Sequence, residues 1–178
     1  MVSLYRWWFL LSEPICFKPI GVVEDGLPRP GEPQRPRSRY EKISIIRIFD
    51  EYVEALKGLE DYSHIIILYW MHEEKRYIPR LKPWGIERYP EVGIFATRFP
   101  PRPNPIALTV VELLSIEENR LRVKGLDAWT GSPVLDIKPY DYYDIVRNPR
   151  IPWWAEEEWR RNSIEKNYKV IAPWLGPL

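Results

Sequence analysis

Short runs of β-branched and aromatic residues recur along most of the chain, separated by prolines and turn residues. They include CFKPIGVV, KISIIRIFD, SHIIILYWMHE, EVGIFATRF and SPVLDIKPYDYYD. SHIIILYWMHE is continuous, which is typical of a strand buried on both faces. IALTVVELLSIEENRLRVKGLDAW predicts a hairpin with Glu118 and Asn119 at its turn. EYVEALKGLEDYS predicts one or two helical turns before Gly58. Many short strands without alternating helices favour a barrel or a sandwich over a doubly wound sheet.

Longer helical periodicity is confined to WWAEEEWRRNSIEKNY, near the C-terminus. Trp153, Trp154, Ala155 and Trp159 stand at helical spacing, with acidic residues early and basic residues late, as the helix dipole favours. Together with Trp174, these tryptophans either stack on nucleic-acid bases or pack the tail onto the barrel or a second copy. We predict packing.

Composition excludes several classes of protein. Lys and Arg number 26 against 25 Asp and Glu, so the net charge of +1 creates no global field toward nucleic acid or membrane. One cysteine, Cys16, excludes an internal disulfide and a cysteine-rich metal site, and the two histidines are too few for a histidine-built metal site without help from carboxylates. The apolar run near the N-terminus is too short to span a bilayer. We expect a soluble cytoplasmic protein without a metal.

Arginines cluster locally despite the neutral total. Such clusters suit contacts with the backbone of an RNA, although scattered arginines also serve solubility. They are Arg29, Arg35, Arg37, Arg39, Arg147, Arg150, Arg160 and Arg161.

The stretch FATRFPPRPNPIAL is rich in proline, which fixes φ and cannot donate a backbone hydrogen bond. It is therefore a stiff loop that holds Arg98, Arg102 and Asn104 in fixed directions. Its rigidity fits either recognition of a ligand or a simple crossover between strands, and the residues alone leave both open.

Four motifs follow one another in a fixed order: KPIGVV, GLEDYSHIIILYWMH, VGIFATRFPPRPNPIAL and GLDAWTGSPVLDIKPY. In these motifs the chain resembles the TsaA-like family, whose characterised members are TrmO-type tRNA adenosine-37 N6-methyltransferases. The resemblance covers residues 17–144. It implies a compact β-barrel that binds S-adenosylmethionine near a homodimer interface. It also implies that the substrate is threonylcarbamoyladenosine in the anticodon loop of tRNA, methylated on N6.

We therefore predict an all-β, mainly β fold: a compact β-barrel with short helices and a C-terminal Trp-rich helical tail. Residues 1–16 are expected to form an N-terminal extension, 17–144 the TsaA-like barrel domain, and 145–178 the tail, which packs on the barrel or on the second copy.

The resemblance also assigns cofactor-binding residues. Arg98 is the arginine of the FATR motif, Leu108 lies beside the adenine, and Asp127 accepts from the ribose hydroxyls or the ammonium group. A zwitterionic cofactor needs a carboxylate, a donor and an apolar slot of this kind. The full set is Pro33, Gln34, His72, Glu73, Arg98, Leu108, Lys124, Gly125, Leu126 and Asp127. Arg102 and Asn104 are expected to bind the substrate.

The DIKPY segment supplies the predicted catalytic residues, Asp136, Lys138 and Tyr140. An exocyclic adenine nitrogen needs a hydrogen-bond acceptor that takes its proton, and a flat base needs a flat side chain. Pro139 is expected to fix a turn between these groups. In the alternative, Asp136 caps a turn and Tyr140 packs, without a catalytic role.

The two histidines differ in their setting. His64 begins the apolar run and is expected to be a satisfied core histidine, whereas His72 ends it, where side chains reach a barrel mouth. The family's motifs are altered at Phe99, Ala107 and Thr130, which leaves the acceptor open. Two alternatives therefore stand beside a tRNA methyltransferase: a noncatalytic nucleotide- or RNA-binding barrel, and a methyltransferase for another small acceptor.

Overall fold

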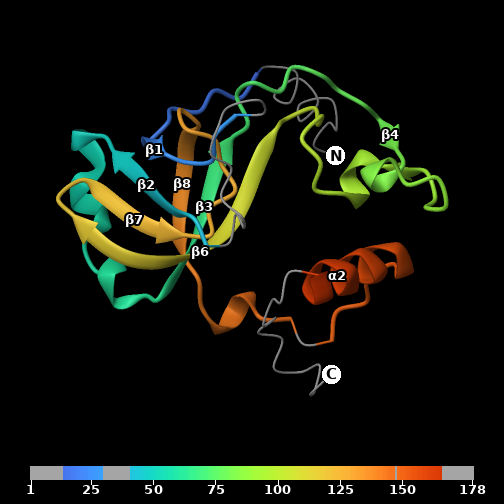
Figure 1. The fold of residues 1–178 in the computed structure, drawn as a ribbon. Coiled ribbons are helices and arrows are strands. Elements are labelled where there is room, and N and C mark those ends of the chain that lie inside the picture. The colour runs from blue at the N-terminus through green and yellow to red at the C-terminus, as the bar shows by residue number, and fades with distance from the viewer. Residues whose placement is uncertain (1–13, 30–40, 147, 166–178) are drawn as a thin grey trace, which may run out of the picture. The chain divides into compact units, whose positions relative to one another are not determined.

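The structure, a computed structural model, describes residues 14–29, 41–146 and 148–165. These residues fall into two compact units that interleave in sequence (Figure 1). The barrel unit comprises the described residues 14–29, 41–76 and 103–140, and the second unit comprises 77–102, 141–146 and 148–165. The predicted boundaries at residues 16 and 144 stay predictions, and residues 1–13 of the predicted extension lie outside the described ranges.

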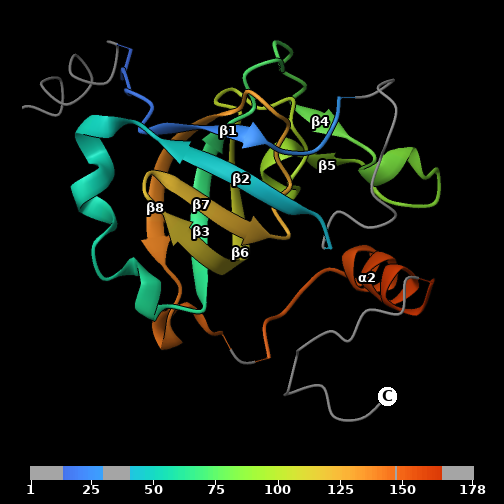
Figure 2. The same ribbon diagram turned by 60° about the vertical axis from the view of Figure 1, so that its left-hand side comes forward.

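Antiparallel strands close the barrel unit in the order β1-β2-β7-β6-β3-β8. The strands are β1 (Gly21–Asp25), β2 (Ile43–Ile48), β3 (His64–Trp70), β6 (Ile106–Glu117), β7 (Arg120–Lys124) and β8 (Pro133–Pro139). In Figure 2 strand β2 crosses over β3, which belongs to the opposite wall. This barrel, with the C-terminal helix described below, confirms the predicted fold class.

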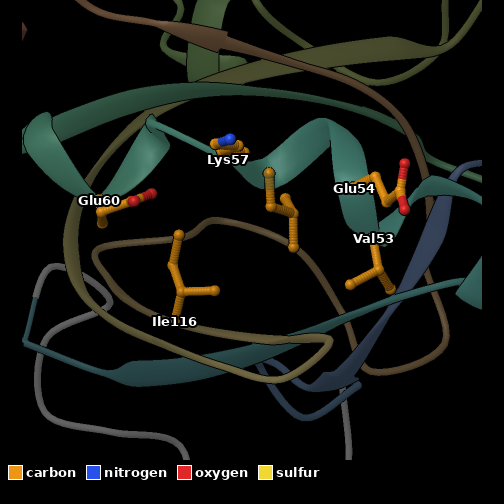
Figure 3. A pocket seen from close by; sticks show the side chains of 6 residues that line it. Val53, Glu54, Lys57, Glu60 and Ile116 are labelled. Atoms are coloured by element: carbon orange, nitrogen blue, oxygen red, sulfur yellow. The ribbon is translucent and has the colours of Figure 1, made fainter.

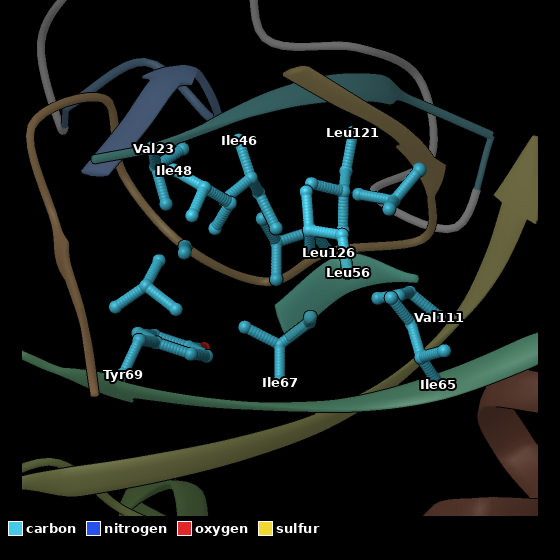
Figure 4. Packing of buried hydrophobic residues seen from close by; sticks show 13 residues of the cluster. Val23, Ile46, Ile48, Leu56, Ile65, Ile67, Tyr69, Val111, Leu121 and Leu126 are labelled. Carbon is cyan, nitrogen blue, oxygen red and sulfur yellow. The ribbon is translucent and has the colours of Figure 1, made fainter. Parts of the chain in front are cut away.

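Aliphatic side chains fill the barrel. Along β3, Ile65, Ile67 and Tyr69 are buried, while the residues between them are partly exposed. The prediction that this strand is buried on both faces is wrong, because a barrel strand has one inner and one outer face. Fully burying an isoleucine stabilises a fold by about 1.5–3 kcal/mol. The rest of the buried cluster is Val23, Ile46, Ile48, Leu56, Val111, Leu121, Val123, Leu126, Ala128 and Val134 (Figure 4).

The predicted hairpin is confirmed. Strands β6 and β7 pair from Glu112↔Lys124 to Glu117↔Arg120, and Glu118 and Asn119 form the turn between them. Glu118 has φ of 54°, in the left-handed region that tight turns use. The Asn119 side chain donates to Asp50 Oδ1 at 3.2 Å. The turn is thus tied to the segment that follows β2.

Glycine is required where the barrel closes. Gly21 pairs with Ile48 of β2 on one side and with Val134 of β8 on the other. A Cβ atom at this position would lie 2.5 Å from the carbonyl oxygen of Arg47, which is closer than real Cβ contacts. Any larger residue would therefore push β1 away from its neighbour.

Two 3₁₀ helices, η1 (Asp50–Leu56) and η2 (Leu59–Asp61), connect β2 to β3. Gly58 lies between them with φ of 87°, a conformation that glycine adopts without steric cost. Leu56 turns inward and joins the barrel core. The one or two helical turns predicted before Gly58 are confirmed.

The second unit has little regular sheet. Strands β4 (Arg80–Leu81) and β5 (Val92–Gly93) form one short pair. The other elements are the 3₁₀ helices η3 (Pro83–Gly85), η4 (Ile94–Ala96) and η5 (Tyr142–Asp144) and the α-helix α2 (Trp153–Glu165). The strand predicted over EVGIFATRF is wrong beyond Gly93. The Ile94 N–H still donates to the Pro79 carbonyl at 3.0 Å, in register with the β4–β5 pair, but the Thr97 N–H and hydroxyl fold back onto the Ile94 carbonyl and end the ladder.

Helix α2 confirms the helix predicted in the C-terminal tail, and its first turn packs on aromatic residues of the same unit. Trp154 is buried, with its ring centroid 6.1 Å from that of Trp84 and 6.5 Å from that of Tyr89. Trp153 lies edge-on to Tyr89 at 5.6 Å. These two tryptophans thus pack on aromatic residues of their own unit. The predicted packing of the tail on the barrel or on a second copy stays a prediction, and Trp174 lies outside the described residues. No described helix is long and apolar enough to cross a membrane.

Candidate functional site

The outer face of the barrel brings a predicted catalytic residue and a predicted cofactor residue into one cross-strand row. Leu68 of β3 pairs with Asp136 of β8 on one side and with Leu108 of β6 on the other. Leu68 faces outward, because its strand neighbours Ile67 and Tyr69 point into the core, and its cross-strand partners Asp136 and Leu108 lie on the same face of the sheet. Adjacent strands lie about 4.8 Å apart, so the backbones of Asp136 and Leu108 are about 10 Å apart. Leu108 is 51% exposed.

The next row carries the partner of Asp136. Ile66 pairs with Lys138 of β8 and with Val110 of β6. Lys138 Nζ lies 2.7 Å from Asp136 Oδ2, and Asp136 Oδ1 accepts from the Ile137 N–H at 2.9 Å. Both oxygens of the carboxylate are therefore held, and the side chain stays about half exposed. The polar edge formed by Asp136 and Lys138 borders the apolar strip of Ile66, Leu68, Leu108 and Val110.

The DIKPY segment is a strand and not the predicted loop. Strand β8 continues through Pro139, which pairs with Ile65, because proline at the end of a strand leaves the ladder intact. The Tyr140 N–H donates to the His64 carbonyl at 3.2 Å, and the two rings lie 6.4 Å apart. His64 is exposed, so the prediction of a core histidine is wrong. The sheet, and not a proline turn, fixes the spacing of Asp136, Lys138 and Tyr140.

A second polar group lies just beyond the end of β3. Glu73 Oε1 is 2.5 Å from Arg29 Nη2 and 3.5 Å from His72 Nε2. His72 Nδ1 is buried and has no hydrogen-bond partner among the described residues. A buried polar atom left in this way usually marks a place for a ligand or a water. The sequence predicted His72 and Glu73 as cofactor residues but placed Arg29 only among the clustered arginines suited to RNA or to solubility, since nothing in the sequence pairs it with Glu73.

The segment after β7 divides its residues between the core and the surface. Lys124 is cross-strand to Glu112, Gly125 has φ of 92°, and Leu126 is fully buried. The Leu126 side chain is therefore unavailable to a cofactor, and only its backbone remains. Asp127 is exposed, and its carbonyl accepts a hydrogen bond from the Tyr69 hydroxyl.

The proline-rich loop contributes to both units. Asn104 belongs to the barrel unit and is exposed, and its carbonyl accepts from the Ile106 N–H at 2.7 Å. Arg98 and Arg102 belong to the second unit. Arg98 is exposed, whereas the Arg102 guanidinium donates to the Thr97 carbonyl of its own loop at 2.7 Å. Pro33 and Gln34 lie outside the described residues.

The described groove in the barrel unit does not coincide with these residues. It is an open depression of about 660 Å³ beside η1 and η2 (Figure 3). Its lining is Val53, Glu54, Leu56, Lys57, Glu60 and Ile116. We place the candidate site on the outer face and at the end of β3 instead, because none of the residues predicted from the sequence to bind or react lines the groove. Within the described ranges, no three His, Cys, Asp or Glu side chains are grouped as metal ligands.

The fold is a small closed antiparallel barrel with a filled interior. Its outer face carries the polar edge of Asp136 and Lys138 beside the apolar strip. The chain belongs to the family described as the tRNA-methyltransferase O N-terminal domain, whose model matches residues 28–145. This confirms the resemblance found in the sequence motifs.

Several relatives share much of this chain. A protein of Archaeoglobus fulgidus named S-adenosyl-L-methionine-binding protein is 48% identical over 126 residues, covering 71% of this chain and 89% of the relative. A Pseudomonas aeruginosa protein named putative S-adenosylmethionine-dependent methyltransferase RcsF is 40% identical over 146 residues, covering 74% and 62%. The crystal structure of TrmO from Pseudomonas aeruginosa matches with a TM-score of 0.62 at 34% identity. That match covers 78% of this chain and 62% of the TrmO chain, so this chain spans under two thirds of that protein.

Proposed function

We propose that this chain is an S-adenosylmethionine-dependent methyltransferase that acts on N6 of threonylcarbamoyladenosine at position 37 of tRNA. The observation that carries the proposal is the row of Asp136, Leu68 and Leu108, because it sets a carboxylate and an apolar surface on one face of the sheet. Family membership and the names of the relatives support the cofactor. With tRNA as its substrate, the protein is also proposed to act in the cytoplasm.

The residues fit a zwitterionic cofactor in kind. Arg98 supplies a donor for its carboxylate, Leu108 an apolar surface for its adenine, and Asp127 an acceptor for its ammonium group or ribose. His72 has a buried nitrogen to satisfy, which supports a ligand at the end of β3. When bound, the cofactor supplies an already activated methyl group on a sulfonium.

Asp136 is proposed to accept the hydrogen bond from N6 and to take its proton as the new N–C bond forms. Lys138 holds that carboxylate in place through its ion pair at 2.7 Å. Lys138 also offers a positive charge to a phosphate or to the threonyl carboxylate of the modified base. Tyr140 stacks on the base, and Asn104 contacts the RNA nearby.

We also propose a homodimer. The apolar strip of Ile66, Leu68, Leu108 and Val110 lies on an open sheet face, and Leu108 and Val110 are 51% and 41% exposed. An open face leaves a cofactor in water, whereas methyl transfer needs water excluded. A second copy packed by two-fold symmetry would cover both strips at once. Light scattering should show a dimer at micromolar concentration, and Val110→Glu should dissociate it, whereas an active monomer would refute it.

Titration calorimetry tests the cofactor. The protein should bind S-adenosylmethionine, and Arg98→Ala should weaken binding by about 1.5–3 kcal/mol if it makes a charge-assisted contact. Arg80→Ala is the matched control, since Arg80 is an exposed arginine of the same unit. Equal affinity in all three proteins would remove Arg98 from the site. No binding by the parent would favour a noncatalytic barrel.

Nucleoside mass spectrometry tests the acceptor. tRNA from a strain that lacks the gene should lack N6-methylated threonylcarbamoyladenosine, and the parent gene should restore it. Asp136→Asn should reduce single-turnover methylation by about a hundredfold or more and leave cofactor affinity nearly intact. Glu112→Gln, on the same outer face, is the control. Normal tRNA in the deletion strain would point to another acceptor.

A further inference from the structure

Arg102 makes its contacts inside its own loop. Its Nη1 donates to the Thr97 carbonyl at 2.7 Å and lies 3.4 Å from the carbonyl oxygens of Ile94 and Phe99. Its guanidinium also covers the Phe95 ring at 5.7 Å. One partly exposed side chain thus contacts three carbonyl groups of its own loop, of which the Ile94 carbonyl also accepts from the Thr97 N–H at 3.0 Å.

The loop residues reinforce this arrangement. Thr97 Oγ1 donates to the Ile94 carbonyl at 2.8 Å and accepts from the Phe99 N–H at 3.3 Å. The Ile78 N–H donates to the Pro101 carbonyl at 3.1 Å. Pro100 and Pro101 add a fixed φ at each position. The backbone from Ile94 to Pro101 is therefore bonded on both sides of Arg98.

Aromatic contacts hold the loop from the other direction. The Phe99 ring lies edge-on to Trp84 at 5.6 Å, and Trp84 lies edge-on to Trp154 of α2 at 6.1 Å. Edge-to-face pairs of this kind prefer one geometry, so they fix direction as well as distance. Arg98 stands between Thr97, which is held by Arg102, and Phe99, which is held by Trp84. No hydrogen bond or ion pair joins the Arg98 side chain to another described residue, and that side chain is exposed.

We infer that Arg102 is a positioning residue, which acts through the Thr97 and Phe99 carbonyls to hold the Arg98 side chain in its binding direction. Sequence patterns favour a substrate contact for this arginine, but its Nη1 is turned onto the loop. The inference rests on the proposed function, in which Arg98 binds the cofactor carboxylate. Its physical basis is preorganisation, because a loop already ordered loses less entropy when the ligand binds.

Hydrogen exchange without cofactor tests whether the contacts of Arg102 hold the loop of residues 94–101, an arrangement that we call the Arg102 clamp. In Arg102→Ala, amides of residues 94–99 should exchange at least about tenfold faster, because the charged hydrogen bonds that close the loop are lost. Arg102→Lys should recover little, since a compact ammonium group cannot lie over the Phe95 ring as the planar guanidinium does. Arg80→Ala should leave exchange in this loop unchanged. Unchanged exchange in Arg102→Ala would overturn the inference.

Calorimetry then tests the link to Arg98. S-adenosylmethionine affinity should fall about tenfold in Arg102→Ala and no further in the double variant with Arg98→Ala than in Arg98→Ala alone. Guanidinium ion at millimolar concentration should restore affinity to Arg102→Ala but not to Arg98→Ala, an effect that general loss of structure would not give. Full additivity of the two substitutions would overturn the positioning role. A parent protein that binds no cofactor would refute the proposed function, while the exchange result would still decide whether Arg102 holds the loop.

Discussion

The barrel unit buries aliphatic side chains behind ladders of backbone hydrogen bonds, whereas the second unit has one pair of two-residue strands and uses rings, prolines and ion pairs instead. Arg88, for example, lies over Tyr89 and pairs with Glu157 of α2. Burial in the barrel depends on total apolar area, which many side chains share. Edge-to-face rings and guanidinium contacts depend on direction. We therefore expect the barrel unit to supply most of the free energy of unfolding and the contacts of the second unit to fix the directions of its side chains.

The largest test of this contrast is a cavity in the barrel. Ile67→Ala should lower the free energy of unfolding by about 3–5 kcal/mol, because Ile67 is fully buried and its neighbours cannot collapse onto the space. Urea denaturation followed by circular dichroism measures it. Ile66→Ala, one position along on the outer face, should cost about 1 kcal/mol or less. Equal losses would mean that the barrel interior is not the main source of stability.

A smaller loss is expected from the rings of the second unit. Trp154→Leu keeps an apolar side chain but removes the edge-on contact with Trp84 and the tilted ring contact with Tyr89. It should cost about 1–2 kcal/mol, and it should speed amide exchange in α2 while leaving exchange in β3 unchanged. Trp153→Leu, at an exposed position, is the control and should cost less. Faster exchange in β3 would show that the two units unfold together.

The backbone of Trp84 offers a finer test. Trp84 has φ of 53° and is followed by Gly85 at 69°, so two successive residues are left-handed. Both Trp84→Gly and Trp84→Ala lose the ring, but only glycine relieves the backbone. Trp84→Gly should therefore be more stable than Trp84→Ala by about 1 kcal/mol in thermal unfolding. The reverse order would mean that the left-handed backbone at residue 84 carries no strain that glycine relieves.

The smallest effect concerns acid stability. Hydrogen bonds from the Arg76 guanidinium, at 2.8 and 2.9 Å, together with the Arg76 N–H, lower the pKa of Glu74 from 4.5 to about 2. The folded state thus favours the ionised carboxylate, so this stabilisation is complete above pH 4.5 and is lost as the pH falls toward 2. Arg76 is well exposed, so solvent screens the pair and its contribution to the free energy of unfolding is small. Glu74→Gln should make the free energy of unfolding less dependent on pH over that acid range, and Glu91→Gln should leave the dependence unchanged.

Patterns local in sequence predicted much of this fold. The β3 run and the turn at Glu118 and Asn119 follow from apolar residues and turn residues a few positions apart. The strand expected over EVGIFATRF ends at Gly93 because the Thr97 N–H and hydroxyl both donate back to the Ile94 carbonyl and turn the chain into η4. Nothing in the apolar pattern reveals that turn.

The candidate site shows the same limit. Asp136 and Lys138 were predicted together, because they are close in sequence and the sheet keeps them on one face. The row that joins Asp136 to Leu108 depends on β3 lying between their strands, which only the barrel order determines. The pairing of Glu73 with Arg29 and the clamp made by Arg102 are contacts of side-chain geometry, and sequence spacing does not encode them.

The barrel closes at a narrow seam that has a consequence for how the chain folds. Strands β1 and β8 share only two residue pairs, Gly21↔Val134 and Val22↔Pro133, whereas β3 and β6 pair along the whole of β3. Backbone bonds from Ile20 to Val134 and from Val23 to Ser132 extend the seam by one residue on each side. The seam joins positions roughly 110 residues apart in sequence. The entropic cost of closing so long a loop therefore precedes the gain from the backbone hydrogen bonds of the seam. The hairpin of β6 and β7 can form early, and the seam would be the last part of the barrel to close. Substitutions at Gly21 should therefore speed unfolding far more than they slow folding.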